Sequence, residues 1–222
     1  MGLDMYIEKY PRIEGVSIEQ ISVFEDWINW KNDKDAAGKT FTEWTGLSED
    51  KLPDAKHRKE LKKFFSTKYW AWDDEHRYPH KRIHDQVAYW RKANAIHKWF
   101  VDHVQDGEDD CGYHDEVSKD VLEELKDACA TVLQNAVLTH GRIKNGERLN
   151  GGEWEPIYED GLVVANPEVC EETLPTESGF FFGGTQYNEW YIADIKETFE
   201  VCCKLLGETD FDKFVLYYRS SW

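Results

Sequence analysis

The sequence predicts an α+β fold: a mainly helical single domain over residues 1–222, with a small sheet formed by the N- and C-terminal strands. Strand-like alternation of side chains occurs at both ends of the chain, and helical periodicity dominates between them. No linker or internal repeat interrupts the 222 residues, and a chain of this length can bury a sizeable core. One domain is therefore expected.

The first strand is expected from Leu3 to Tyr10, where side chains alternate until Pro11. Ser17 is a predicted N-cap, because Gln20 follows three residues later as in a capping box. The apolar spacing that follows predicts a helix that ends near Asn32.

Helical patterns dominate the middle of the chain. Two short helices are expected at residues 42–47 and 54–65, joined at Pro53. The longest helix is expected from about Lys81 to Gln105, because apolar side chains recur there every three or four residues. Ser118 is expected to cap a further amphipathic helix.

The C-terminal part is expected to be looped first and regular afterwards. Glycine and proline are frequent between residues 136 and 186 and periodic runs are few, which predicts a long loop region that is functional or mobile. Thr185 or Asn188 is a predicted cap for a last long helix, and a strand is expected at residues 213–219. The inward face of that helix is predicted to carry Trp190, Tyr191, Ile195, Phe199, Cys202 and Leu206.

Charge excludes several function classes. The chain has 27 Lys and Arg against 44 Asp and Glu, a formal net charge of −17. Duplex nucleic acid and anionic membranes both attract basic faces, so neither is an expected partner. No apolar run approaches the roughly 18–20 residues that span a bilayer, and the first residues lack the pattern of a secretory signal. Five cysteines without a CxxC pair indicate reduced thiols, so a cytoplasmic location is expected.

One candidate site is a metal site around three histidines. His76, His80 and His84 follow two carboxylates, and these ligand types suit zinc or another divalent cation. Residues four apart share a helix face, so His80 and His84 would hold the metal together, whereas Pro79 places His76 in the preceding loop. The alternative is a polar surface near a helix N-terminus.

A second candidate site is the segment at residues 89–101. Asn94 and His97 interrupt an apolar stripe, where an unpaired polar group costs about 1–3 kcal/mol, so both need partners from the fold or from a ligand. In the functional alternative, Trp90 joins them on a pocket wall, and Arg91 or Lys98 at the rim counters an anionic group.

A third candidate site is the glycine-bounded run of three phenylalanines at residues 174–185. Three consecutive phenylalanines cannot all face one side of a strand, so Phe181 is a candidate to cover a ligand. Gly183, Gly184 and Thr185 lead into a predicted helix N-terminus, where backbone N–H groups can bind an anion. The alternative is a tight turn beside the core.

Four blocks of the sequence point to one kind of source. They are MGLDMY at residues 1–6, YWRKANAIHKWFV at residues 89–101, DDC at residues 109–111, and residues 174–191. Together they resemble a family of small proteins of tailed bacteriophages and prophages. The resemblance implies a phage or prophage origin and the host bacterial cytoplasm, and it implies no activity. Residues 29–76 have no counterpart in it, which fits a lineage-specific insertion.

Three function hypotheses follow. The first is a phage accessory protein that binds a small polar or nucleotide-type ligand and sequesters a host defence signal. The second is an acidic inhibitor that docks on a basic host protein as a nucleic-acid mimic. The third is a metal-dependent hydrolase with His76, His80 and His84 as ligands. The first is favoured and an enzyme is not, because the sequence has no GxSxG elbow, no GxGxxG after a strand and no kinase motif set.

Overall fold

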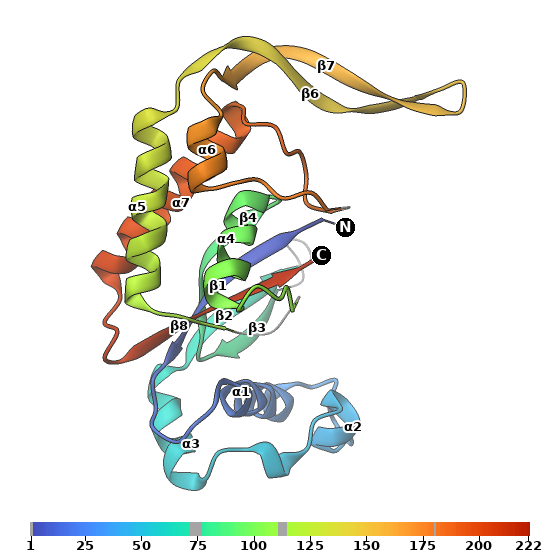
Figure 1. Ribbon diagram of the computed structural model, residues 1–222. Helices are drawn as coiled ribbons and strands as arrows, with labels where there is room; N and C mark the ends of the chain where they lie inside the picture. Colours follow the sequence, from blue (N-terminus) through green and yellow to red (C-terminus); the bar gives the residue numbers. More distant parts are fainter. Residues whose placement is uncertain (1, 72–76, 111–114, 180) are drawn as a thin grey trace. The chain divides into compact units, whose positions relative to one another are not determined.

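The α+β prediction is confirmed by a computed structural model that describes residues 2–71, 77–110, 115–179 and 181–222 (Figure 1). A four-stranded sheet has the order β4-β1-β8-β5. In this sheet β1 (Asp4–Pro11) and β8 (Phe214–Ser221) are neighbours, so the predicted pairing of the two chain ends is also confirmed.

The described residues form two compact units. The first contains Met1–Glu8, Gln86–Thr209 and Leu216–Trp222, and the second contains Lys9–Asp85 and Asp210–Val215. The expectation of one domain with an insertion at residues 29–76 stays a prediction. Each unit is described separately below.

The second unit is built on one capped helix. Ser17 caps α1 (Ile18–Asn32): its hydroxyl accepts from the Gln20 N–H at 3.2 Å, and the Gln20 side chain accepts from the Ser17 N–H at 3.1 Å. The predicted capping box is therefore confirmed. The buried Glu25 carboxylate of α1 accepts from the backbone N–H groups of Ile83 and His84, which ties the helix to the end of the hairpin. The remaining elements are α2 (Phe41–Thr45), α3 (Ala55–Leu61), 3₁₀ turns at Glu49–Lys51 and Lys62–Phe64, and the antiparallel pair β2 (Ser66–Ala71) and β3 (Arg77–Arg82).

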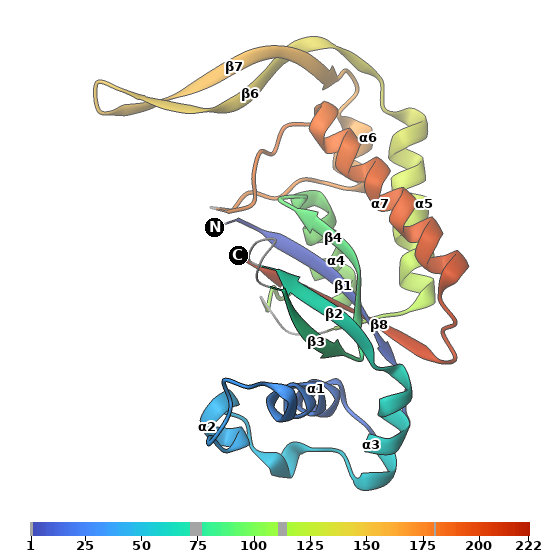
Figure 2. The same cartoon turned by 180° about the vertical axis from the view of Figure 1, so that it is seen from behind.

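The first unit packs three helices together: α4 (Asn94–Val104), α5 (Lys119–Asn135) and α7 (Glu189–Glu208). Figure 2 shows α5 and α7 side by side, and the short α6 (Glu168–Thr173) contacts α5. Ser118 accepts from the Val121 N–H at 3.2 Å and caps α5 as predicted. The short β5 (Asp115–Val117) pairs with β8. Among the described helices, none combines the length and apolarity needed to cross a membrane.

The predicted helix from Lys81 to Gln105 is wrong over its first half. This stretch contains the end of β3, then β4 (Asp85–Arg91), and only then α4. In β4 burial alternates, with Ala88 and Trp90 buried and Tyr89 40% exposed, so the period is two rather than 3.6. The apolar stripe belongs to two different elements that happen to follow one another.

The prediction of a loop region at residues 136–186 is wrong for residues 138–164 and 168–173, whereas the described residues from 174 to 186 form no helix or strand. The first part of this region is a long antiparallel hairpin of β6 (Leu138–Asn150) and β7 (Glu153–Val164). The two-residue loop is Gly151-Gly152, with left-handed φ values of 60° and 96°, and a Gly-Gly pair between strands is a hairpin signal that loop-like composition concealed. The last helix begins after Asn188 as predicted, but its Trp190 is 63% exposed, and Leu205 rather than Leu206 is buried.

A part-buried ion pair joins the two terminal strands. The Arg219 Nε atom lies 3.0 Å from the Oε1 atom of Glu8, which is 4% exposed, and the guanidinium lies over the Tyr6 ring at 4.1 Å. Arg219→Met is expected to lower the free energy of unfolding by about 3 kcal/mol, because it removes the guanidinium that pairs with a buried carboxylate. Urea denaturation measures this loss.

The matched control is Lys196→Met, since Lys196 pairs with Glu200 at 4.0 Å while both side chains are more than two-thirds exposed. We expect a change within about 0.5 kcal/mol for the control. Equal losses in the two variants would contradict a stabilising role for the Glu8–Arg219 pair.

Candidate ligand-binding site

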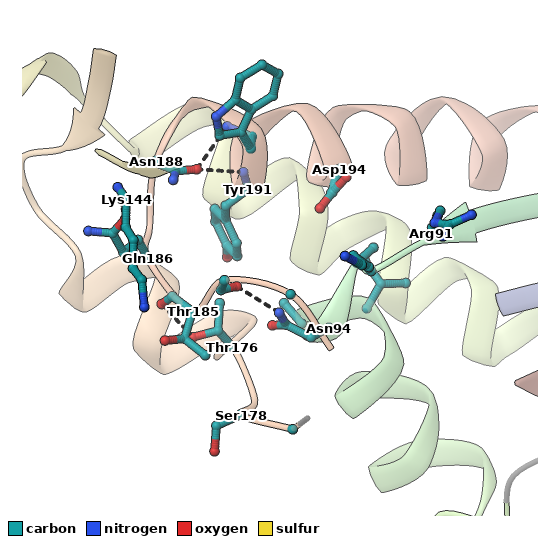
Figure 3. Close-up of a pocket in the computed structure, with 18 of the residues that line it drawn as sticks. Arg91, Asn94, Lys144, Thr176, Ser178, Thr185, Gln186, Asn188, Tyr191 and Asp194 are labelled. Carbon is teal, nitrogen blue, oxygen red and sulfur yellow. Dashed lines mark hydrogen bonds between the residues drawn. The ribbon is translucent and has the colours of Figure 1, made fainter. Parts of the chain in front are cut away.

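A pocket of about 540 Å³ opens in the first unit, where four segments meet (Figure 3). They are the turn from β4 into α4, the segment at residues 176–188, the start of α7, and β6. The volume falls within the range of small-molecule sites, roughly 300–1,000 Å³. The lining consists of Arg91, Lys92, Ala93, Asn94, Ala95, Ile96, Lys144, Asn145, Thr176, Ser178, Gly179, Gly183, Gly184, Thr185, Gln186, Asn188, Trp190, Tyr191 and Asp194.

The turn between β4 and α4 has an uncommon backbone conformation. Lys92 has a left-handed φ of 61°, and its N–H donates to the Leu3 carbonyl at 2.8 Å. Gly183, with φ of 90°, lies against it: a Cβ atom at position 183 would stand 3.2 Å from Lys92 Cβ and 3.4 Å from its carbonyl oxygen. Backbone strain of this kind is concentrated at functional sites, where surrounding contacts hold it in place.

Asn94, the first residue of α4, fastens the segment above it. Its amide donates to the carbonyls of Phe182 at 3.0 Å and Gly184 at 2.8 Å, and its oxygen accepts from the Glu177 N–H at 3.2 Å. The side chain is only 4% exposed. Its hydrogen bonds are directed to the fold, so Asn94 builds the wall of the pocket.

The start of α7 forms the opposite wall. Asn188 caps the helix by accepting from the N–H groups of Trp190 and Tyr191 at 3.0 and 3.2 Å. The Tyr191 hydroxyl donates to the Leu174 carbonyl at 2.9 Å, and burial raises the pKa of this phenol. These bonds fix the helix end, while the Trp190 indole stays 63% exposed at the pocket.

The cationic side chains that line the pocket, among the described residues, are Arg91, Lys92 and Lys144. The Lys144 ammonium pairs with Glu147 at 2.5 Å, and its backbone N–H donates to Gln186 Oε1 at 2.7 Å. Neither Arg91 nor Lys92 has an ion pair within the described part of the chain. The pocket is therefore locally basic in a protein of formal charge −17.

Backbone donors add to this basic character. The N–H groups of Ala95, Gly183, Gly184 and Thr185 have no acceptor among the described residues. Ala95 lies in the first turn of α4, and this turn belongs to the pocket lining. No side chain caps the N-terminus of the helix, so the partial positive charge of that end is not neutralised by a cap. Free N–H groups beside cationic side chains favour an anionic ligand.

Among the described residues, Asp194 is the one acidic side chain that lines the pocket. It is half-buried on α7, and its carboxylate has no hydrogen-bond or ion-pair partner among the described residues. Burial, and to a lesser extent the nearby Glu197, raises the pKa of this carboxyl to about 7. The group therefore changes its charge near neutral pH.

The structure brings some of the residues predicted from the sequence together and separates others. Arg91, Asn94, Gly183, Gly184 and Thr185 line one pocket. The pocket lining does not include Trp90, His97, Lys98 or Phe181. Trp90 is 2% exposed and packs against Phe100, and the Phe181 carbonyl accepts from the Leu3 N–H at 3.1 Å.

His97 finds its partners within the fold, which was the structural alternative. Its Nδ1 lies 2.7 Å from the Tyr218 hydroxyl, and its Nε2 lies 3.1 Å from the Asp109 carboxylate. The Trp222 indole N–H donates to the same carboxylate at 2.9 Å. Lys98 pairs with Asp102 at 2.8 Å, which raises the pKa of the lysine.

The helical basis of the predicted metal site is wrong. His80 lies on β3 and His84 follows that strand, so the two do not share a helix face. The His80 Nε2 lies 3.2 Å from Asn29 Nδ2, and the His84 Nδ1 lies 3.0 Å from Glu25. His76 lies outside the described residues, and within those residues no three His, Cys, Asp or Glu side chains form a metal-binding group.

Sequence reasoning missed several lining residues, namely Lys92, Lys144, Gln186, Trp190 and Asp194. Trp190 and Asp194 are four residues apart on one helix and therefore share a face. A carboxylate on the same face as Trp190 argues against the prediction that this tryptophan faces the core, and this spacing is visible in the sequence. Lys144 and Gln186 are distant in sequence from the other pocket residues and carry no local signal.

Asn94→Ala is expected to lower the free energy of unfolding by about 2–3 kcal/mol, because it removes three hydrogen bonds and leaves partly buried backbone groups unpaired. Amide hydrogen exchange should show loss of protection in residues 176–186. Asn166→Ala is the control, because Asn166 makes comparable side-chain hydrogen bonds to residues 135 and 137 at an exposed site. Undiminished protection of residues 176–186 would contradict the fastening role.

Asp194→Asn is expected to stabilise the protein at pH 8 but not at pH 4. A folded-state pKa of about 7, above the ordinary value of 3.8, means that the contribution of Asp194 to stability is present below pH 3.8 and lost as pH rises through 7. Asparagine does not ionise, so the Asp194→Asn variant should not lose this stability as pH rises. Denaturation at both pH values measures the difference, and an equal effect at both would contradict the raised pKa.

Comparison of the chain with protein-family models, with curated proteins and with solved structures gives no match. The resemblance to proteins of tailed phages therefore stays a prediction from the sequence. What the pocket binds is inferred from its own residues and geometry.

Proposed function

We propose that the chain is a binding protein for a small ligand that carries an anionic group and a planar ring, as a nucleotide does. The observation that carries the proposal is that one pocket of ligand size combines cations without an ion pair and backbone N–H groups without an acceptor, as far as the described residues show. Arg91 and Lys92 lack ion pairs within the described residues, and both line the pocket. The chain as a whole has a formal charge of −17 and repels anions, so a local cluster of cations is where an anionic ligand would bind.

The anionic group is assigned to the side of the pocket formed by the β4–α4 turn and the glycines. Arg91 and Lys92 stand at the end of β4, and the same pocket is lined by Ala95, Gly183 and Gly184, whose N–H groups have no acceptor among the described residues. Charge-assisted hydrogen bonds are about twice as strong as neutral ones, and a guanidinium can bind a phosphate through two of them. A phosphate group fits these donors.

The planar ring is assigned to Trp190. Its indole is 63% exposed although its helix neighbour Tyr191 is buried, so the fold leaves this large aromatic surface uncovered at the pocket. Stacking of a base on an aromatic side chain contributes about 1–3 kcal/mol. One stack and one charge-assisted phosphate contact together support micromolar affinity.

The proposal favours binding over catalysis. Asn94 and His97, the polar residues that the sequence placed in an apolar stripe, direct their side chains to partners in the fold. Together with the resemblance to phage proteins, ligand binding leads us to propose sequestration of a nucleotide-type host defence signal in the bacterial cytoplasm. Sequestration requires affinity and needs no catalytic group.

Isothermal titration of the purified chain with AMP, GMP and inorganic phosphate tests the proposal. We expect micromolar dissociation constants for the nucleotides and weaker binding of phosphate alone. Arg91→Met and Lys92→Gly should each weaken nucleotide binding by about tenfold, since each removes one charge-assisted contact worth about 1.5 kcal/mol or more. Glycine at position 92 keeps the left-handed backbone while it removes the charge.

Lys119→Met is the control, because Lys119 is an exposed lysine of α5 outside the pocket lining. Its removal should leave the nucleotide affinity unchanged. The absence of any heat of binding with every nucleotide would overturn the proposed function, as would equal weakening by all three substitutions.

A further inference from the structure

We propose that the pocket selects guanine among the bases, because it places an unpaired carboxylate one helical turn from an exposed indole. The inference rests on the proposed function and deepens it: it names the base that a nucleotide ligand would carry. The two residues concerned are Asp194 and Trp190, which both line the pocket and lie on α7.

The spacing of these residues fits a stacked base. Positions i and i+4 of a helix lie on one face, with Cβ atoms about 5–6 Å apart. The ring of a base stacked on the Trp190 indole therefore presents its edge in the direction of Asp194. Figure 3 shows Asp194 on α7 beyond Tyr191, on the side of the pocket where Arg91 also lies.

The carboxylate of Asp194 is available to a ligand. It has no hydrogen bond to the protein within the described residues, and no ion pair there joins it to Arg91, Lys92 or Lys144. A half-buried carboxylate without a partner is costly, because burial removes water that would otherwise solvate it. A ligand with N–H donors at the right edge offsets this cost.

Guanine is the base whose edge suits a carboxylate. An ionised carboxylate only accepts hydrogen bonds, and its two oxygens can take two parallel donors. Guanine presents adjacent N1–H and N2–H donors on its Watson–Crick edge. Adenine presents one N6–H donor beside the N1 lone pair, which repels a carboxylate oxygen, and hypoxanthine presents N1–H alone. The expected order of affinity is therefore guanine, hypoxanthine, adenine.

Protonation of Asp194 should reverse part of this preference. A neutral carboxyl donates one hydrogen bond and accepts another, which matches the N1 and N6 positions of adenine. Burial and Glu197 on the next turn raise the pKa of Asp194 to about 7. The charged groups that line the pocket from the other elements are Arg91 and Lys92 of the β4–α4 turn and Lys144 of β6. Because Asp194 loses its proton between pH 6 and 8, the guanine preference should grow over this range.

The test is titration of the full chain with GMP, IMP and AMP at pH 8. We expect GMP to bind at least about tenfold more tightly than AMP, with IMP between them, because GMP offers the carboxylate one more charge-assisted hydrogen bond than IMP and avoids the lone-pair repulsion of AMP. Asp194→Asn should reduce the GMP-to-AMP ratio to below about threefold, because an amide pairs with either base. The loss should come from weaker GMP binding.

The matched control is Glu197→Gln, which removes the same charge from an exposed position one turn further along α7 and leaves the pocket lining intact. It should keep the GMP preference at pH 8. Between pH 6 and 8 the GMP-to-AMP ratio of the wild-type chain should rise several-fold, and the ratio is used because the phosphate ionises alike in both ligands. The asparagine variant should show no such rise.

The outcomes separate the two proposals. Equal affinities for GMP, IMP and AMP, or a preference that survives in Asp194→Asn, would overturn the guanine assignment while the nucleotide-binding function stands. A wild-type preference for AMP at pH 8 would do the same. The absence of binding to every nucleotide would overturn the proposed function and the guanine assignment together.

Discussion

The pocket depends on the three hydrogen bonds of Asn94. This one side chain joins the start of α4 to carbonyl and N–H groups of residues 177, 182 and 184, which lie more than 80 positions later in the sequence. Ordering a segment without regular structure costs about 1–2 kcal/mol per residue in backbone entropy, so residues 176–186 need anchors of this kind. With the segment fixed, its glycines can line a cavity and need not collapse into it.

The site also shows how local and total charge can differ in sign. The chain carries a formal charge of −17, yet Arg91, Lys92 and Lys144 line one pocket, where Asp194 is the one acidic residue among those that the structure describes. At physiological ionic strength charges interact over about 8 Å, so the acidic surface beyond that distance is largely screened from a bound anion. Under the proposed function, the cations that line the pocket therefore favour an anionic ligand despite the acidic total charge.

Local signals allowed much of the fold to be predicted. Ser17, Ser118 and Asn188 cap their helices because a short polar side chain satisfies free N–H groups within its own turn, and that requirement is visible in the sequence. The sequence also predicted that Asn94 and His97 need hydrogen-bond partners, because both interrupt an apolar stripe. It could not identify those partners, since they come from distant segments. The helix expected over β4 failed for a related reason: in a short stretch, a period of two and a period of 3.6 can share the same apolar positions.

The close approach of Gly183 to Lys92 restricts how the sequence of this site can change. Gly183 has a left-handed backbone, and a Cβ atom there would stand 3.2–3.4 Å from atoms of Lys92. A larger residue could fit at position 183 only if the turn that carries Lys92 moved. The residues that position 183 can accept therefore depend on the backbone conformation at position 92. In homologues of this chain, Gly183 should be present wherever the turn at Lys92 is kept. Where that turn has changed, we expect both Gly183 and Lys92 to be replaced.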